Sequence, residues 1–192
     1  MNILPCDTSG FVARVFDFGP GHLSDRNEID KLRQAMTQHQ VLVISNQDVD
    51  NENYLLELGR LFGKIHVDPR AEYGNRASGG TAYVSNIREN GELIGFMGHG
   101  IMGWHHDRTY LANPPIAVLL AAAIVPDQGG DTWFADMYRA YDTMPTSLLE
   151  KIQDLKLGPS TESAAAYSQH ISFLSTKQQA AQHIPKSVLA VT

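Results

Sequence analysis

Residues 104–110 read Trp-His-His-Asp-Arg-Thr-Tyr, and the interpretation of the whole chain starts from this stretch. It brings imidazole, carboxylate and aromatic side chains together in a few residues. If the stretch is a β-strand, successive side chains point to opposite faces, so His105 and Asp107 share one face while His106 and Arg108 share the other. We therefore expect the donors of His105 and Asp107 to converge on one point and His106 to be directed away from it.

This His-x-Asp pair has two interpretations. With one more donor, an imidazole and a carboxylate form the facial triad that binds non-haem Fe(II) and leaves positions open for a cosubstrate and oxygen. A histidine that is hydrogen-bonded to a nearby aspartate is also ordinary in folded proteins. The tripeptide alone leaves both interpretations open.

The composition narrows the class of protein. The chain has 192 residues, the length of one domain, and 15 Lys and Arg against 21 Asp and Glu give a net charge of −6, which does not favour a nucleic-acid partner. The longest apolar run, Ile116–Val125, is far shorter than the ~20 residues that cross a bilayer, and no secretory signal is visible. The single cysteine, Cys6, fits a reducing compartment. We expect one cytoplasmic globular domain over residues 1–192, with no membrane partner.

Hydrophobic periodicity predicts helices and strands in alternation. Apolar residues at helical spacing predict a helix over Ser24–Gln40, with Ser24 or Asp25 as its cap. A β-branched run predicts a buried strand over Val41–Ser45, and a second apolar stripe predicts a helix from Asp50 to Gly63. Later expectations are paired strands at Thr81–Asn86 and Leu93–Phe96 around an Asn90-Gly91 hairpin turn, paired strands at Ile116–Val125 and Asp131–Asp136, a helix at Thr146–Leu155 and a loop at Gly158–Gln169.

The segments that follow residues 104–110 strengthen the metal interpretation. They are Asn113-Pro114-Pro115, the apolar run, Val125-Pro126, and Gly129-Gly130-Asp131-Thr132-Trp133. In order and spacing they resemble the taurine dioxygenase and chlorophenoxyacetate dioxygenase family of Fe(II)- and 2-oxoglutarate-dependent oxygenases. The resemblance runs from about residue 10 to the end and is most specific between residues 104 and 145. It is also carried by His39–Val43, Leu61–His66, Ala140-Tyr141 and Met144-Pro145.

The resemblance implies an α+β fold, with a double-stranded β-helix (jelly-roll) core and flanking helices. It implies an oxidoreductase that uses Fe(II) and O2, takes 2-oxoglutarate as cosubstrate and releases succinate while it hydroxylates or oxidatively cleaves a small organic substrate. His105 and Asp107 match the family's first two iron ligands. Thr132 matches the residue whose hydroxyl binds a carboxylate of 2-oxoglutarate, although a β-branched strand residue without a ligand is the structural alternative.

Two family features have no match here. The family's third ligand is a downstream histidine followed by an arginine that binds 2-oxoglutarate, but no arginine follows Arg139, and neither His170 nor His183 has the expected context. We therefore expect the second half of the barrel to be missing. The remainder could be absent, be supplied by another chain, or be lost from a natural remnant.

A jelly roll cut at this point exposes sheet edges and an apolar face. We therefore expect a homo-oligomer or a second chain that completes the barrel. Two functional alternatives remain: a non-catalytic truncated homologue that acts as a binding or assembly subunit, and a cupin-like metal protein that uses other ligands among the eight histidines.

The substrate is not identified by the sequence. Asp68 stands where taurine dioxygenase has a histidine and would repel a sulfonate, which argues against taurine itself, and His66 lies two residues earlier. His99 lies in a glycine-rich segment from Gly95 to Gly103, which we predict to be a lid or an ordinary loop. The candidate substrate contacts are His66, Asp68, His99 and Arg108.

Overall fold

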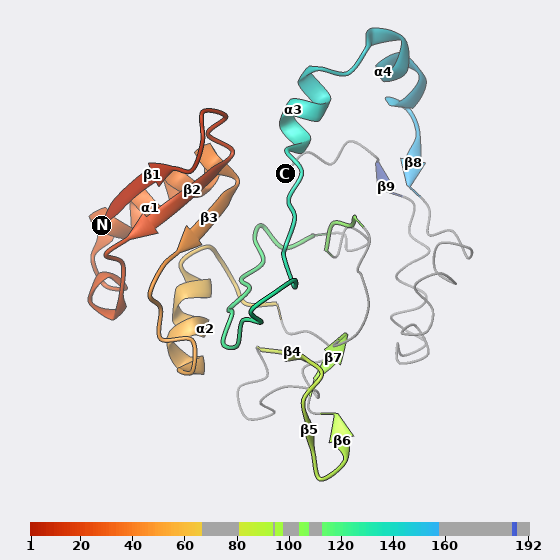
Figure 1. Cartoon of the computed structure of the whole chain (residues 1–192). Coiled ribbons are helices and arrows are strands. Elements are labelled where there is room, and N and C mark those ends of the chain that lie inside the picture. Colours follow the sequence, from red (N-terminus) through yellow and green to blue (C-terminus); the bar gives the residue numbers. More distant parts are fainter. Residues whose placement is uncertain (67–80, 94, 98–103, 108–112, 158–185, 188–192) are drawn as a thin grey trace. The chain divides into compact units, whose positions relative to one another are not determined.

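The computed structural model describes all residues except 67–80, 94, 98–103, 108–112, 158–185 and 188–192 (Figure 1). It divides into two compact units. The first contains Met1–Ile101 and Leu119–Thr132, and the second contains Met102–Val118 and Trp133–Thr192.

The first unit is built on a three-stranded sheet of mixed direction. Strand β1 (Asn2–Pro5) pairs antiparallel with β2 (Val12–Phe16), and β2 pairs parallel with β3 (Val41–Ile44). Helix α1 (Arg26–His39) connects the two parallel strands, as such a pair requires, and a short 3-10 turn, η1 (Pro20–His22), precedes it. The predicted strand at Val41–Ser45 is confirmed, whereas β1 and β2 were not predicted.

Local hydrogen bonds fix both ends of α1. The Asp25 carboxylate accepts hydrogen bonds from the backbone N–H groups of Asn27 and Glu28 and so caps the helix, which confirms one of the two predicted caps. At the other end the buried His39 donates from Nδ1 to the Gly10 carbonyl at 2.6 Å. This bond ties the end of α1 to the loop between β1 and β2.

Helix α2 (Glu52–Arg60) confirms the second predicted helix, although it ends before the expected stop at Gly63. Asn51 caps it by accepting from the backbone N–H of Tyr54. The Tyr54 hydroxyl donates to the side-chain oxygen of Gln47, and Gln47 donates to the Phe18 carbonyl at 2.9 Å. Burial raises the pKa of the Tyr54 phenol. The two hydrogen bonds link α2 to the segments that follow β2 and β3.

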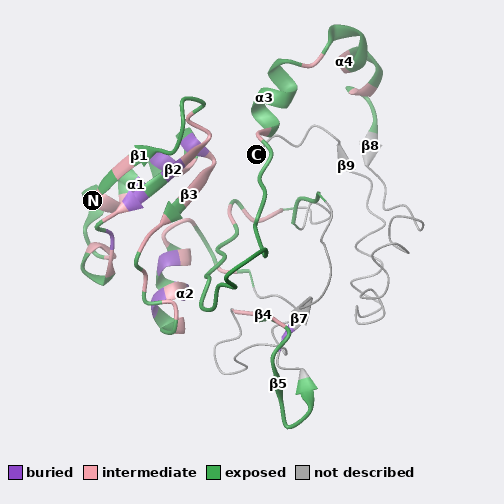
Figure 2. Ribbon diagram, viewed as in Figure 1, coloured by how far each residue is buried: buried purple, intermediate pink, exposed green. Residues whose placement is uncertain are grey.

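The core lies between the sheet and the two helices, where Figure 2 shows the buried residues. Its fully buried members come from β2, α1, α2 and the segment that follows β2. Side chains with partial exposure pack around them. The buried members are Val15, Phe18, Leu32 and Leu58.

The Asn90-Gly91 turn forms as predicted. Both residues have positive φ, 51° and 87°, which is the geometry of a tight hairpin turn. The strands that it joins differ from the prediction: β5 (Arg88–Glu89) pairs antiparallel with β6 (Glu92–Leu93). The outer strands β4 (Val84–Ser85) and β7 (Phe96–Met97) pair parallel instead of forming the expected antiparallel ladder.

The expected strands at Ile116–Val125 and Asp131–Asp136 are wrong as secondary structure. The structure describes residues 113–136 as irregular, although Gly129 and Gly130 both adopt φ of +74° and turn the chain between the two segments. An extended segment becomes a strand only when a neighbour satisfies its backbone N–H and C=O groups. Within the described residues, no strand pairs with either segment.

The second unit contains two short helices with no buried residue. Helix α3 (Met137–Asp142) was not predicted, and Asp136 caps it by accepting from the backbone N–H of Arg139. Helix α4 (Thr146–Ile152) confirms the predicted helix at Thr146–Leu155, but it is shorter. The unit also pairs β8 (Lys156–Leu157) antiparallel with β9 (Lys186–Ser187).

Helices and a mixed sheet together are consistent with the predicted α+β class. Among the described residues, every helix falls short of the length and apolar character needed to span a bilayer. The predicted loop at Gly158–Gln169 lies outside the described residues.

The burial of the core side chains predicts how substitutions change the free energy of unfolding. Leu32 is fully buried and Leu4 is 57% exposed, so we expect Leu32→Ala to lower the free energy of unfolding by about 2–5 kcal/mol. The matched variant Leu4→Ala is expected to change it by no more than about 0.5 kcal/mol. Urea unfolding followed by circular dichroism measures both values, and equal losses would show that this cluster is not the core.

Candidate metal centre

The His-x-Asp pair lies in an irregular segment. Residues 104–107 belong to the second unit and form no strand, while residues 108–110 lie outside the described residues. The expectation of a strand is therefore wrong for the described part of the stretch. As with residues 113–136, no neighbouring strand within the described residues pairs with this backbone.

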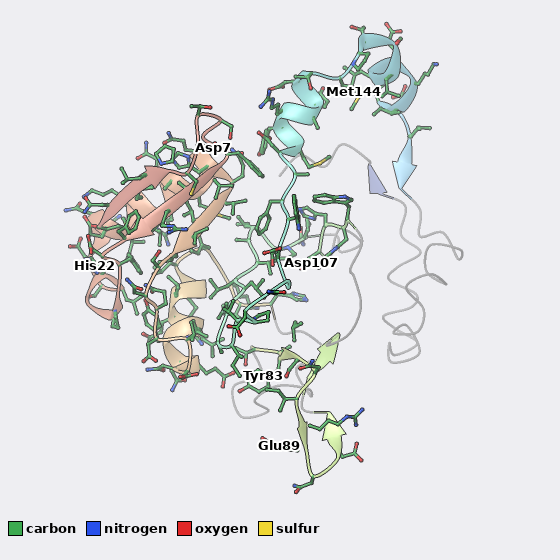
Figure 3. The ribbon with its side chains drawn as sticks, viewed as in Figure 1. Asp7, His22, Tyr83, Glu89, Asp107 and Met144 are labelled. Atoms are coloured by element: carbon green, nitrogen blue, oxygen red, sulfur yellow. The ribbon has the colours of Figure 1, made fainter. Side chains whose placement is uncertain are left out.

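The structure nevertheless brings the two predicted donors together. Nε2 of His105 lies 3.5 Å from Oδ1 of Asp107, and Figure 3 labels Asp107. This separation exceeds the 2.7–3.2 Å typical of an N–H···O hydrogen bond, so the two groups lie side by side without forming a short bond. The side chains are 40% and 48% exposed, which leaves the pair accessible from solvent.

The distance between the donors fits a shared metal ion. Protein nitrogen and oxygen ligands lie about 2.0–2.2 Å from a first-row metal ion, so two donors on one ion are at most about 4.2 Å apart, and about 3.0 Å apart at a right angle. The 3.5 Å between His105 Nε2 and Asp107 Oδ1 falls inside these limits. Imidazole and carboxylate are also the donor types of the facial iron triad.

Within the described residues, no group of three or more His, Cys, Asp or Glu side chains could hold a metal ion together. The neighbouring His106 is exposed and joins no such group. The predicted roles of His105 and Asp107 as metal ligands therefore stay predictions.

The structure does not relate Thr132 to the pair. Thr132 is exposed, follows the Gly129-Gly130 turn and belongs to the first unit, whereas His105 and Asp107 belong to the second. Its predicted contact with 2-oxoglutarate therefore stays a prediction.

The four candidate substrate contacts also stay predictions. His66 is exposed and belongs to the first unit. Asp68, His99 and Arg108 lie outside the described residues. Of the glycine-rich segment predicted as a lid, the described part includes Gly95, which is buried.

Comparison with known proteins shows that the chain matches one protein family. Residues 4–187 match the sequence profile of the "Taurine catabolism dioxygenase TauD, TfdA family". The chain is 30% identical over 155 residues to pentalenolactone F synthase of Streptomyces avermitilis. The matched region covers 80% of this chain and 50% of that protein. It is also 30% identical over 155 residues to (S)-phenoxypropionate/alpha-ketoglutarate-dioxygenase of Sphingobium herbicidovorans. Here the matched region covers 81% of this chain and 52% of that protein.

A third relative is the alpha-ketoglutarate-dependent sulfonate dioxygenase of Saccharomyces cerevisiae. It is 30% identical over 145 residues, which make up 73% of this chain and 35% of the yeast protein. The chain thus spans about half the length, or less, of these curated relatives.

The geometry of the pair makes a prediction about metal binding. Loss of a residue that merely supports a ligand lowers metal affinity about 10–100-fold, so we expect His105→Ala to lower Fe(II) affinity by at least about 10-fold. The adjacent His106→Ala is the matched control and is expected to leave the affinity unchanged. Anaerobic equilibrium dialysis against Fe(II) measures both. Equal losses in the two variants would contradict a site that uses His105.

Proposed function

Because the chain belongs to the taurine catabolism dioxygenase TauD, TfdA family, we propose that it is an Fe(II)- and 2-oxoglutarate-dependent dioxygenase. It hydroxylates or oxidatively cleaves a small organic substrate, consumes O2 and decarboxylates 2-oxoglutarate to succinate and CO2. The 3.5 Å approach of His105 Nε2 to Asp107 Oδ1 is the observation that supports this function most directly. The names of two relatives state dependence on alpha-ketoglutarate, which supports the same cosubstrate here.

In this proposal His105 and Asp107 hold the iron, and both must be deprotonated to do so. The bound Fe(II) supplies the redox chemistry by which O2 and 2-oxoglutarate react. The residues of the chain fix where the ion sits. The partial exposure of both side chains supports access for the ion and for 2-oxoglutarate.

The proposal places this pair on a jelly-roll core. The third protein donor and a cation for the distal carboxylate of 2-oxoglutarate then come from outside the described residues, through a second chain or a homo-oligomer that completes the barrel. One observation supports this: within the described residues, no group of three or more possible ligands could hold the ion.

Thr132 is proposed to bind a carboxylate of 2-oxoglutarate through its hydroxyl. A hydroxyl can donate one hydrogen bond to such a carboxylate, and the exposure of Thr132 leaves it accessible. The proposed substrate contacts are His66, Asp68, His99 and Arg108.

The decisive experiment is binding of Fe(II) with 2-oxoglutarate without oxygen. Chelation of the iron by 2-oxoglutarate gives a weak visible charge-transfer band, which we expect for the wild-type chain and for His106→Ala. We expect no band for His105→Ala or for Asp107→Ala. A wild-type spectrum that matches that of His105→Ala would overturn the proposal and favour the non-catalytic subunit.

The role of Thr132 is tested by the same band. A hydrogen bond to a charged group contributes about 1.5–3 kcal/mol, so Thr132→Val is expected to weaken 2-oxoglutarate binding about 10-fold or more. Thr132→Ser keeps the hydroxyl and is expected to bind nearly as well as the wild type. The affinity is measured by titrating the band with 2-oxoglutarate. If Thr132→Val binds as tightly as Thr132→Ser, the hydroxyl is not a ligand.

A further inference from the structure

The turn of the β5–β6 hairpin carries the one asparagine of the chain that precedes a glycine, Asn90-Gly91. Both residues are exposed, as are the residues of β5 beside them (Figure 2). Within the described residues, no hydrogen bond holds the side-chain amide of Asn90 or the backbone N–H of Gly91. An unbonded backbone nitrogen therefore follows an unbonded side-chain amide.

The Gly91 nitrogen is also unshielded. Glycine has no Cβ, and a Cβ added at Gly91 would meet no heavy atom within 4 Å. Every other asparagine of the chain is followed by a residue that carries a side chain. At Asn90 alone, no side chain on the next residue hinders the approach of that residue's nitrogen to the side-chain carbonyl carbon.

The hairpin around this turn is weakly held. It forms a sheet of its own with two residue pairs, and an isolated two-stranded hairpin is marginally stable in water. The pair next to the turn sets the carboxylates of Glu89 and Glu92 on directly opposite residues, which destabilises the ladder. One side-chain hydrogen bond, from Nη1 of Arg88 to the Gly91 carbonyl at 2.7 Å, supports the turn. The backbone of Asn90 can therefore rotate out of the turn, as ring closure with Gly91 requires.

We propose that Asn90 is a site of spontaneous deamidation. The Gly91 nitrogen attacks Cγ of Asn90 and the new C–N bond closes a succinimide ring. The Cγ–Nδ2 bond breaks, and the Nδ2 group leaves as ammonia with the proton of the Gly91 N–H. Water then hydrolyses the ring: opening at Cγ gives aspartate, and opening at the main-chain carbonyl gives isoaspartate. No electrons are transferred, and water is the co-reactant.

Both products change the hairpin. Each adds a carboxylate between Glu89 and Glu92, in a chain whose net charge is already −6. In isoaspartate the main chain runs through Cγ and is one carbon longer, so the two-residue turn no longer fits the register of the ladder. The modification therefore separates β5 from β6, and it does not depend on the iron site.

Peptide masses test the site. Trypsin releases residues 89–108 as one peptide, in which Asn90 is the only asparagine and glutamine is absent. The matched control is peptide 27–31, where the exposed Asn27 precedes Glu28, whose N–H is hydrogen-bonded to a carboxylate. We expect the folded wild-type chain, kept for days at neutral pH and physiological temperature, to gain one dalton in the first peptide and nothing in the control. An unchanged first peptide, or an equal gain in both, would overturn the proposal.

Isoaspartate content tests the route through the succinimide. An isoaspartyl methyltransferase with a labelled methyl donor labels isoaspartate and leaves aspartate unlabelled. We expect label in peptide 89–108 of the aged chain, because the ring opens at either carbonyl. A one-dalton gain without label would show direct hydrolysis of the amide and would overturn the attack by Gly91.

A charge substitution tests the role of the hairpin. Glu92→Lys sets an ammonium group opposite Glu89 and is expected to slow the deamidation of Asn90 several-fold, because an opposite-charge pair stabilises the ladder. The control Glu57→Lys makes the same charge change at an exposed position of α2 and is expected to keep the wild-type rate. Equal rates in the two variants would contradict opening of the hairpin as the step that limits the reaction.

Discussion

The requirement that every strand find a partner for its backbone governs this structure. Strands β1, β2 and β3 satisfy one another's N–H and C=O groups, and a cluster of buried apolar side chains packs on their sheet. Residues 116–125 are apolar throughout, but within the described residues they have no strand to pair with and are irregular. The intrinsic preference of a residue for the strand conformation has less effect on strand formation than the availability of a pairing partner.

The same requirement separates what the sequence predicts from what it does not. Helices α1, α2 and α4 follow from apolar periodicity and capping residues within their own segments, and the Asn90-Gly91 turn follows from two residues that tolerate positive φ. Strand pairing is a relation between distant segments. The parallel pairing of β4 with β7 and the irregular Ile116–Val125 run therefore could not be obtained from local patterns. Strands β1 and β2 are short and carry polar residues, which weakens their period-2 signal.

The candidate site was predictable for a different reason. His105 and Asp107 are two residues apart, and residues at that separation approach each other in a strand and also in the irregular backbone observed here. The sequence therefore predicts that the two side chains lie close together, even though the expected strand is wrong for residues 104–107. The third ligand and the 2-oxoglutarate contacts that we propose belong to distant segments, and local spacing in the sequence carries no information about them. Thr132 was proposed from the family resemblance alone.

The position of the core along the chain has a consequence for biosynthesis. Among the described residues, the four buried members of the core cluster, from Val15 to Leu58, and the partly buried side chains packed against them lie within the first 62 residues. Domains generally fold from the N-terminus while synthesis continues. This part of the protein can therefore collapse on the ribosome before His105 and Asp107 have been translated. The apolar run that follows them then emerges beside an already folded neighbour, which limits its chances of being trapped in a non-native core.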